Sequence, residues 1–250
     1  MVLAGVLSAF GPAATAQADD NTFGGAEVAY THDSNFSASP ADVPLSPDSS
    51  TVYFGYLAHY WPSQDLRNAV LVRAEGALVR QRTFTAFDST DYGASLGLYH
   101  AFSTRNVLTA SAGLLVRHFS DSSFDSHTRS AQATLKHKLT ATVSLREYLT
   151  VESSRVSTAD FSNRGWSIGT SATWAPVRRS QVSLNLSWWG RTYDGAPGAD
   201  RSGKQAGVAA LRQLGEALYV RVSIARQRNE TLAGVGYKNT NYSFALGLDM

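Results

Sequence analysis

The sequence contains no cysteine, few charged residues and no long apolar run. Because cysteine is absent from all 250 residues, disulfides and thiolate chemistry are excluded. Charged residues make up 17% of the chain and the formal net charge is only +2, so composition gives no reason to expect a nucleic-acid partner. No stretch reaches the roughly 18 consecutive apolar residues that would predict a membrane-spanning helix. These absences exclude thiol enzymes and helical membrane proteins.

The N-terminal stretch is apolar and built largely from small residues. Residues 2–16 read VLAGVLSAFGPAATA, and Ala16-Gln17-Ala18 before two aspartates fits a small-x-small cleavage site. Two glycines and a proline within this stretch disfavour a buried helix. The pattern predicts a cleaved signal peptide over residues 1–18 and an exported domain over residues 19–250.

The exported part is rich in glycine and aromatic residues, and its hydrophobicity alternates with a period of two. Apolar residues occupy every second position from Tyr92 to Leu98 and again from Leu108 to Val116, and small or polar residues stand between them. A polar turn over residues 103–106 separates the two runs. A period of two predicts β-strands with one apolar and one polar face. Runs of about ten residues have the length of a tilted strand that crosses a bilayer.

Twelve segments of this kind can be delimited, and long polar links alternate with short turns between them. The segments are 22–32, 51–61, 66–82, 92–102, 108–117, 127–139, 142–152, 166–174, 182–188, 205–213, 218–224 and 242–248. The last two long links cover residues 194–204 and 229–236. An even strand number with short periplasmic turns and longer external loops is typical of outer-membrane barrels. The sequence therefore predicts an all-β fold, a transmembrane antiparallel up-and-down β-barrel of about twelve strands in the bacterial outer membrane.

Aromatic residues gather near the predicted strand ends, where an interfacial girdle is expected. They are Tyr60, Trp61, Phe102, Phe119, Trp166, Trp174, Trp188, Trp189 and Tyr193. The whole pattern resembles Gram-negative outer-membrane β-barrel proteins. Such proteins end in an aromatic-x-apolar-x-apolar signal, and Tyr242, Phe244, Leu246 and Leu248 look like that signal. The resemblance implies outer-membrane lipid as the surroundings and leaves room for a protein partner in an envelope assembly, but for no nucleic acid.

If the apolar rows face lipid, the opposite rows face the lumen. The predicted lumen-lining charges are Arg73, Glu75, Arg117, Lys136, Lys138, Arg146, Glu152 and Arg221. A charge that faces lipid at the midplane costs about 2–4 kcal/mol, whereas a lumen charge can be hydrated or paired. Basic residues outnumber acidic ones in this set, so an open lumen would favour anions. Alternatively, pairs such as Arg73 and Glu75 fill a narrow barrel.

Two further charges do not fit this arrangement. His137 and Glu147 fall on the lipid-facing rows. Their position predicts either a local β-bulge, which would shift the register, or a location near a membrane interface.

One short segment has residues that could carry chemistry. His32 and Ser34, in the run THDSN at residues 31–35, lie on one face of an extended strand, so a hydroxyl nucleophile and an imidazole base could meet. The run resembles the His-x-Ser segment of outer-membrane phospholipase A, which implies lipid-ester hydrolysis with Ca²⁺ at the oxyanion site. Residues 49–51 (Ser-Ser-Thr) stand where that family has an Asn. The run also resembles barrels of polysaccharide-export and lipoprotein-assembly systems. A third interpretation is a loop entry that satisfies its own backbone.

The remaining residues predict no cofactor and no metal site. The six histidines lack metal-ligand spacing, and no phosphate-loop pattern is present. The sequence favours a small channel, or the membrane component of an export or surface assembly. A phospholipase-like hydrolase that uses Ser34 and His32 and a structural barrel that docks a partner are the alternatives.

Overall fold

The computed structural model describes residues 21–35, 47–195, 200–231 and 236–250. The predicted signal peptide over residues 1–18 lies outside the described residues. In the described part of the chain, no helix is long and apolar enough to cross a membrane.

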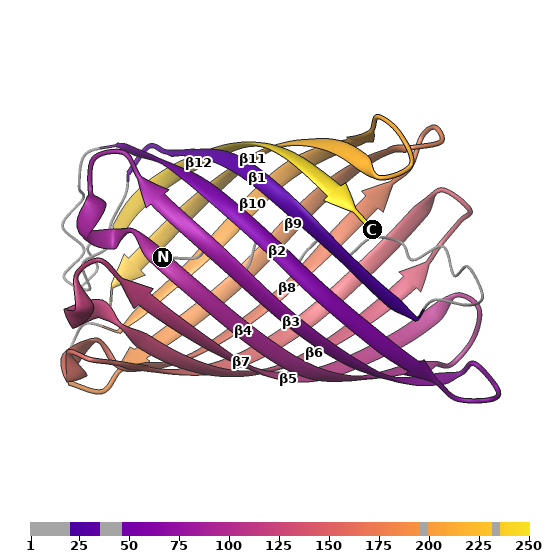
Figure 1. Cartoon of the computed structure of the whole chain (residues 1–250), viewed down its shortest axis with the longest axis horizontal. Coiled ribbons are helices and arrows are strands. Elements are labelled where there is room, and N and C mark those ends of the chain that lie inside the picture. The colour runs from indigo at the N-terminus through magenta and orange to yellow at the C-terminus, as the bar shows by residue number, and fades with distance from the viewer. Residues whose placement is uncertain (1–20, 36–46, 196–199, 232–235) are drawn as a thin grey trace.

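Twelve antiparallel strands form one closed barrel, in which each strand pairs with its sequence neighbours and β1 pairs with β12 (Figure 1). The strands are β1 (Thr22–Asp33), β2 (Asp48–Pro62), β3 (Asn68–Gln81), β4 (Ser89–Ala101), β5 (Asn106–Phe119), β6 (Ser126–Lys138), β7 (Val143–Val156), β8 (Asn163–Trp174), β9 (Ser180–Tyr193), β10 (Arg201–Gln213), β11 (Leu218–Thr231) and β12 (Gly236–Asp249). The predicted all-β barrel of twelve strands is confirmed. Closure leaves no strand edge unpaired, as a structure inside lipid requires.

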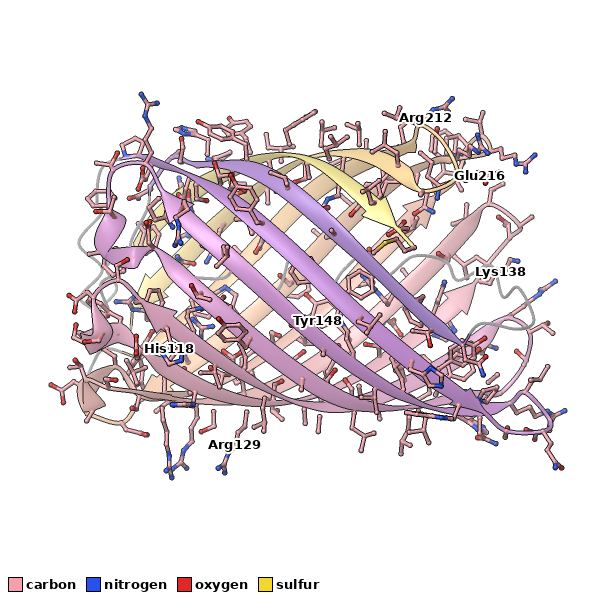
Figure 2. All side chains as sticks on the ribbon, viewed as in Figure 1. His118, Arg129, Lys138, Tyr148, Arg212 and Glu216 are labelled. Carbon is pink, nitrogen blue, oxygen red and sulfur yellow. The ribbon has the colours of Figure 1, made fainter. Side chains whose placement is uncertain are left out.

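Large apolar side chains point outward around the barrel wall (Figure 2). Leu57 is 59% exposed, and Leu96 and Leu114 are exposed to a similar degree. Exposed apolar surface of this extent is unusual for a soluble protein and is stable when it faces lipid tails. The period of two in the sequence thus becomes an apolar outer face and a polar inner face.

The predicted aromatic girdle is correct for one group of residues and wrong for another. Trp61, Trp166 and Trp174 point outward near strand ends and are about half exposed. Trp188 also points outward, but it lies five residues before the end of β9. Tyr60, Phe119, Trp189 and Tyr193 belong instead to the inward rows. Since alternation assigns each residue to a face, proximity to a strand end alone does not place a ring at the membrane interface.

Several strands continue past the point where the apolar alternation stops. The predicted link 194–204 is too long, because β10 begins at Arg201, and the predicted link 229–236 is too long, because β11 continues to Thr231. Backbone pairing persists here, with Arg228 directly opposite Lys238. The outward residues in these extensions are polar, so hydrophobicity gives no strand signal although the ladder of hydrogen bonds continues.

Three 3-10 turns follow one another around the long-loop end of the barrel. They are η1 (Thr85–Phe87), η2 (Ser122–Phe124) and η3 (Ala159–Phe161), and each ends in a phenylalanine at an equal sequence interval. The Phe87 and Phe124 ring centroids are 4.9 Å apart, and the Phe124 and Phe161 rings stack at 5.6 Å. Phe124 also makes an edge contact with Phe119 of β5 at 6.3 Å. The turns are therefore joined by a ladder of aromatic rings.

Backbone hydrogen bonds join the same loops. The Ser120 amide donates to the Asp88 carbonyl at 2.8 Å, and the Ser157 amide donates to the Asp125 carbonyl at 2.8 Å. The Asp194 amide donates to the Ser162 carbonyl at 2.9 Å. Each loop thus binds the preceding one, which extends the cross-linked wall beyond the sheet.

Buried apolar residues form only one small cluster among the described residues. Ala29, Val52, Val79 and Ala245 pack together on the inward side of β1, β2, β3 and β12, with Phe54 beside them. No layered hydrophobic core fills the described part of the barrel. Its stability must therefore rest on the strand ladders, inward polar contacts and lipid.

Candidate functional site: the lumen wall

The inward rows of the middle strands carry mostly small or hydroxyl side chains. On β6 they are Ser126, Thr128, Ser130, Gln132 and Thr134, and on β8 they are Gly165, Ser167, Gly169, Ser171 and Thr173. These rows alternate with the exposed apolar residues, so they face the barrel interior. These side chains are short, and their hydroxyls can hydrogen-bond water.

A buried ion pair crosses β12 near the short-turn end. Arg221 of β11 donates to Glu27 of β1, and Tyr219 donates its hydroxyl to Glu27 Oε2 at 2.9 Å. Glu27 and Tyr219 both stand opposite Gly247 of β12. A Cβ at Gly247 would overlap the Tyr219 ring, so only glycine allows the tyrosine to cross the strand. The side chains of Arg221 and Glu27 are 7% and 6% exposed.

A second ion pair crosses β8 in the same way, nearer the long-loop end. Arg191 Nη2 of β9 lies 2.8 Å from Glu152 Oε1 of β7. Both residues stand opposite Gly165 in the strand register. A Cβ at Gly165 would lie 3.0 Å from Glu152 Oε1 and 3.3 Å from Arg191 Cγ. In both ion pairs that cross a strand, the residue of the middle strand that lies between the partners is therefore a glycine.

Two more arginines form ion pairs, one with a residue of the neighbouring strand and one within its own strand. Arg117 of β5 stands directly opposite Asp91 of β4, and Arg117 Nη2 lies 2.7 Å from Asp91 Oδ2. On β3, Arg73 Nε lies 3.0 Å from Glu75 Oε2. This contact is an ion pair, but its geometry does not make it a hydrogen bond. The Arg73 guanidinium also sits 4.4 Å from the Tyr56 ring centroid, a cation–π distance.

Two lysines and an arginine lie on the inward rows of β6 and β7, across the lumen from the Glu27–Arg221 pair. Lys136 of β6 stands directly opposite Arg146 of β7, and Lys138 follows on the same inward row near the short-turn end. Among the described residues, neither lysine forms an ion pair. In a closed barrel of twelve strands, β6 and β7 lie across the lumen from β12 and β1. This basic strip (Lys136, Lys138 and Arg146) therefore faces the wall that holds Glu27.

The structure places the sequence-predicted lumen charges on the inward rows. They are Arg73, Glu75, Arg117, Lys136, Arg146, Glu152 and Arg221. The partners Glu27, Asp91, Arg191 and Tyr219 were missed from the sequence. Each of them occupies an inward position in the alternation of its strand, so alternation alone could have identified them as lumen residues. Their pairing could not have been found in this way, because it crosses an intervening glycine or depends on strand register.

His137 and Glu147 lie on outward rows, close to the short-turn end. The β6–β7 register runs without interruption from Ser126 to Lys138, so no bulge displaces them. His137 Nε2 lies 3.5 Å from Glu147 Oε2. Of the two predictions for this pair, the location near an interface is correct, and the two side chains contact each other there.

The structure does not bring His32 and Ser34 together. His32 Nδ1 lies 3.0 Å from the hydroxyl of Ser49 on β2, whereas the Ser34 hydroxyl contacts Asn239 Oδ1 at 3.3 Å and accepts the Thr240 amide at 2.8 Å. Both serines are engaged at the long-loop end of the barrel. In the described part of the chain, no cluster of three or more His, Asp or Glu side chains could hold a metal ion.

Asp125 fixes the second of the three loops electrostatically. Its carboxylate accepts the Phe119 amide at 2.8 Å and lies 3.0 Å from His118 Nδ1. The hydrogen bond from His118, followed by that from the Phe119 amide, lowers the pKa of Asp125 below its ordinary 3.8.

Three solved structures of similar fold are bacterial outer-membrane channels or porins. An outer membrane channel of Pseudomonas putida F1 matches with a TM-score of 0.71 and 12% identity over 96% of this chain and 100% of its own. The outer membrane channel DcaP of Acinetobacter baumannii matches with a TM-score of 0.52 and 7% identity over 92% and 96%. The KdgM porin matches with a TM-score of 0.51 and 8% identity over 89% and 98%. No family model and no curated protein sequence matches the chain.

At such low identities the similarity concerns the fold. Together with the closed sheet and the apolar outward face, it identifies the chain as an outer-membrane β-barrel. In this class the short turns face the periplasm and the long loops face outward. The long-loop end is therefore the outer rim of the barrel, and the short-turn end is the inner rim.

Proposed function

We propose that the protein is a small passive channel with a preference for anions. The observation that carries this proposal is the inward surface of β4 to β8, where glycine, serine and threonine predominate. A barrel sealed by its own side chains would need bulky inward residues, as smaller filled barrels have. The channels of similar fold are consistent with this proposal.

The preference for anions rests on how four inward acids and the two inward lysines of the basic strip are paired. Glu27, Glu75, Asp91 and Glu152 each contact an arginine, which neutralises much of their field. The two lysines of the basic strip have no such partner among the described residues. A permeating anion would meet uncompensated positive charge there, and lining charges of one sign select ions of the other.

Reversal potentials in planar bilayers test this proposal. With folded protein in a KCl gradient, we expect stepwise conductance. We also expect a reversal potential between zero and the equilibrium potential of chloride. The variant Lys136→Glu/Lys138→Glu should shift the reversal potential toward the equilibrium potential of potassium. Glu147→Gln changes a charge on the outward face and serves as the matched control, which should leave selectivity unchanged. An absence of conductance steps, or selectivity for potassium in the unaltered protein, would contradict the proposal.

A lipid hydrolase at the outer rim is the second candidate, because His32 contacts a serine hydroxyl. That serine is Ser49, at 3.0 Å, so a histidine-activated nucleophile would be Ser49 rather than Ser34. Release of fatty acid from phospholipid in detergent with Ca²⁺, lost in Ser49→Ala and retained in Ser34→Ala, would support it. No release from the unaltered protein would remove this candidate.

A membrane component of an export or surface assembly and a structural barrel that docks a partner are further candidates. Both need a stable protein partner, whereas a passive channel does not. Purification from native membranes in mild detergent separates them from a channel. A second protein in constant proportion would favour them, and a barrel that purifies alone and conducts ions would favour the channel.

A further inference from the structure

Basic side chains project outward just beyond the apolar band at the outer rim. They form two patches, Lys204, Arg228 and Lys238 on β10 to β12, and Arg129, Arg155 and Arg164 on β6 to β8. All six side chains are exposed and have the same parity as the lipid-facing residues of their strands. They lie outside the barrel, separate from the lumen wall, so any role they have is independent of the proposed channel function.

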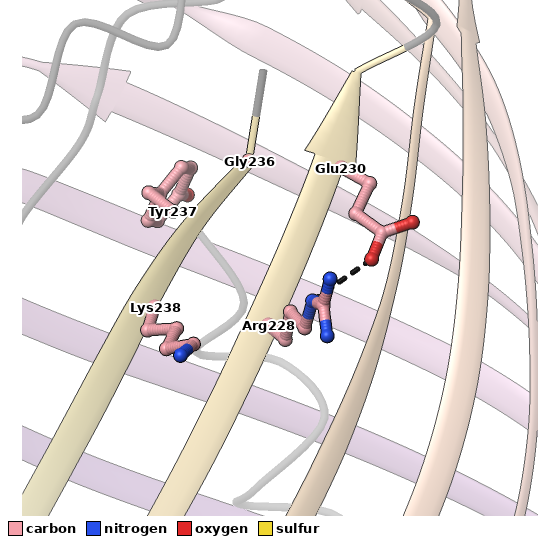
Figure 3. Close-up of a pocket in the computed structure, with 5 residues that line it drawn as sticks. All are labelled: Arg228, Glu230, Gly236, Tyr237 and Lys238. Carbon is pink, nitrogen blue, oxygen red and sulfur yellow. Dashed lines mark ion pairs between the residues drawn. The ribbon is translucent and has the colours of Figure 1, made fainter. Parts of the chain in front are cut away.

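The β10–β12 patch is built by strand register. Lys204 stands directly opposite Arg228, and Arg228 stands directly opposite Lys238. A hollow of about 410 Å³ lies at this position, and the residues that line it include Arg228, Glu230 and Lys238. Figure 3 draws these side chains. Glu230 pairs with Arg228 at 2.8 Å, and both side chains are about half exposed. One carboxylate thus faces three cations in this patch.

The β6–β8 patch has the same character on another part of the wall. Arg129 and Arg164 both stand opposite Ser153 of β7, and Arg155 lies two residues further along that strand. The Arg129 side chain points away from the barrel in Figure 2. Among the described strand residues, no acid shares an outward row with these arginines at the outer rim.

Like charges on directly opposed strand residues repel one another, so such rows are unfavourable without an anionic ligand. The inner rim does not repeat this arrangement. Among the described strand residues, its outward rows carry only Glu147 and Arg212 as permanently charged groups, and Glu147 contacts His137. Among the described strand residues, rows of outward basic side chains therefore occur at the outer rim and not at the inner rim, where the exposed arginines (Arg67, Arg105, Arg178 and Arg179) belong to the short turns.

The patches lie at the level of lipid head groups. On β11, the exposed Val222 and Ile224 precede Arg226 and Arg228 on the outward row, and on β12, Lys238 precedes the exposed Tyr242. Basic clusters directly beside the hydrocarbon region bind anionic lipid head groups. We propose that the two patches bind the phosphate groups of a phosphorylated glycolipid in the outer leaflet.

Binding of bisphosphorylated lipid A to the folded, detergent-solubilised full-length protein tests the proposal. Lys204→Gln/Arg228→Gln/Lys238→Gln and Arg129→Gln/Arg155→Gln/Arg164→Gln should each weaken binding at their patch. At roughly fivefold for each basic residue near a charged lipid surface, the expected loss is about a hundredfold. Arg212→Gln, at the inner rim, is the matched control and should bind as the unaltered protein does. Lipid A without its phosphates should bind weakly to every form.

Thermal unfolding provides a second readout that shows whether the variants fold. The bisphosphorylated lipid should raise the Tm of the unaltered protein and of Arg212→Gln, and should raise it less in each triple variant. All forms should keep the heat-modifiable gel shift of a folded barrel. Equal binding by folded triple variants, or equal binding of the dephosphorylated lipid, would overturn the proposal. Binding of inorganic pyrophosphate as tight as that of lipid A would overturn the assignment to a membrane lipid.

Discussion

Glycine residues determine which charged side chains can meet inside this barrel. Gly247 and Gly165 each lie beneath a contact between strands that are not hydrogen-bonded neighbours. The absence of a Cβ lets an arginine or tyrosine lie flat across the middle strand. The Glu27 and Arg221 side chains are nearly fully buried, so removing one partner leaves the other charge buried and uncompensated.

The Glu27–Arg221 pair gives a prediction at this scale. Glu27→Gln leaves the Arg221 guanidinium buried without its counter-charge, and we expect the free energy of unfolding to fall by about 3 kcal/mol. Urea unfolding in lipid vesicles measures this change. The double variant Glu27→Gln/Arg221→Met should recover most of the loss, and Glu147→Gln in its exposed pair should cost less than about 0.5 kcal/mol. If Glu27→Gln lowered the free energy of unfolding by no more than Glu147→Gln does, the Glu27–Arg221 pair would contribute little to stability.

Asp125 gives a prediction about pH. A carboxyl group whose pKa is lower in the folded chain than in the unfolded chain stabilises the fold above its unfolded pKa, and this contribution disappears as pH falls through the folded pKa. Protection of the amides of residues 118–126 from hydrogen exchange, relative to intrinsic rates, should therefore fall below about pH 4. In Asp125→Asn, protection should be lower throughout and should not vary over this range. A flat profile in the unaltered protein would contradict the assignment.

At the scale of elements, the sequence predicted the strands better than it predicted the loops. Alternation of apolar and small residues located all twelve strands, because each strand separates lipid from the lumen. It failed beyond the apolar band, where Lys204, Arg228 and Lys238 continue the sheet with no hydrophobic signal. It also could not pair Glu27 with Arg221, since that contact requires the closure of β1 on β12. The His32–Ser34 hypothesis rested on spacing within one strand, and the neighbouring strand supplies Ser49 instead.

The phenylalanine ladder gives a prediction at the element scale. Phe124 contacts Phe87, Phe161 and Phe119, and aromatic pairs contribute about 0.5–1.5 kcal/mol each beyond their buried area. Phe124→Ala should loosen the loops on both sides, so limited proteolysis should cut near η1 and η3 as well as η2. Phe102→Ala, in an exposed turn at the inner rim, is the control. Cleavage confined to the substituted loop would show that the ladder does not couple the three turns.

The whole molecule consists of one sheet with an apolar outer surface and a polar inner surface. The small apolar cluster on β1, β2, β3 and β12 is the only buried core among the described residues, and under the proposed function the other inward rows line a water-filled lumen. The arginine pairs fix parts of this wall, and the basic strip gives the opposite side its charge. The proposed water-filled lumen inside an apolar exterior would account for the strand pattern, the small inward residues and the position of the charges.

Cysteine labelling on one strand tests the water-filled barrel most directly, and the absence of native cysteine makes the experiment clean. Single cysteines replace Gln132 and Thr134 on the inward row of β6, and Ala131 and Ala133 on its outward row. The protein is reconstituted in lipid vesicles and treated with a charged, membrane-impermeant maleimide, with Ser122→Cys in an exposed loop as the reference for full reaction. We expect positions 132 and 134 to react and positions 131 and 133 to resist. Equal reaction at all four positions, or reaction at 131 and 133 alone, would contradict a water-filled barrel in lipid.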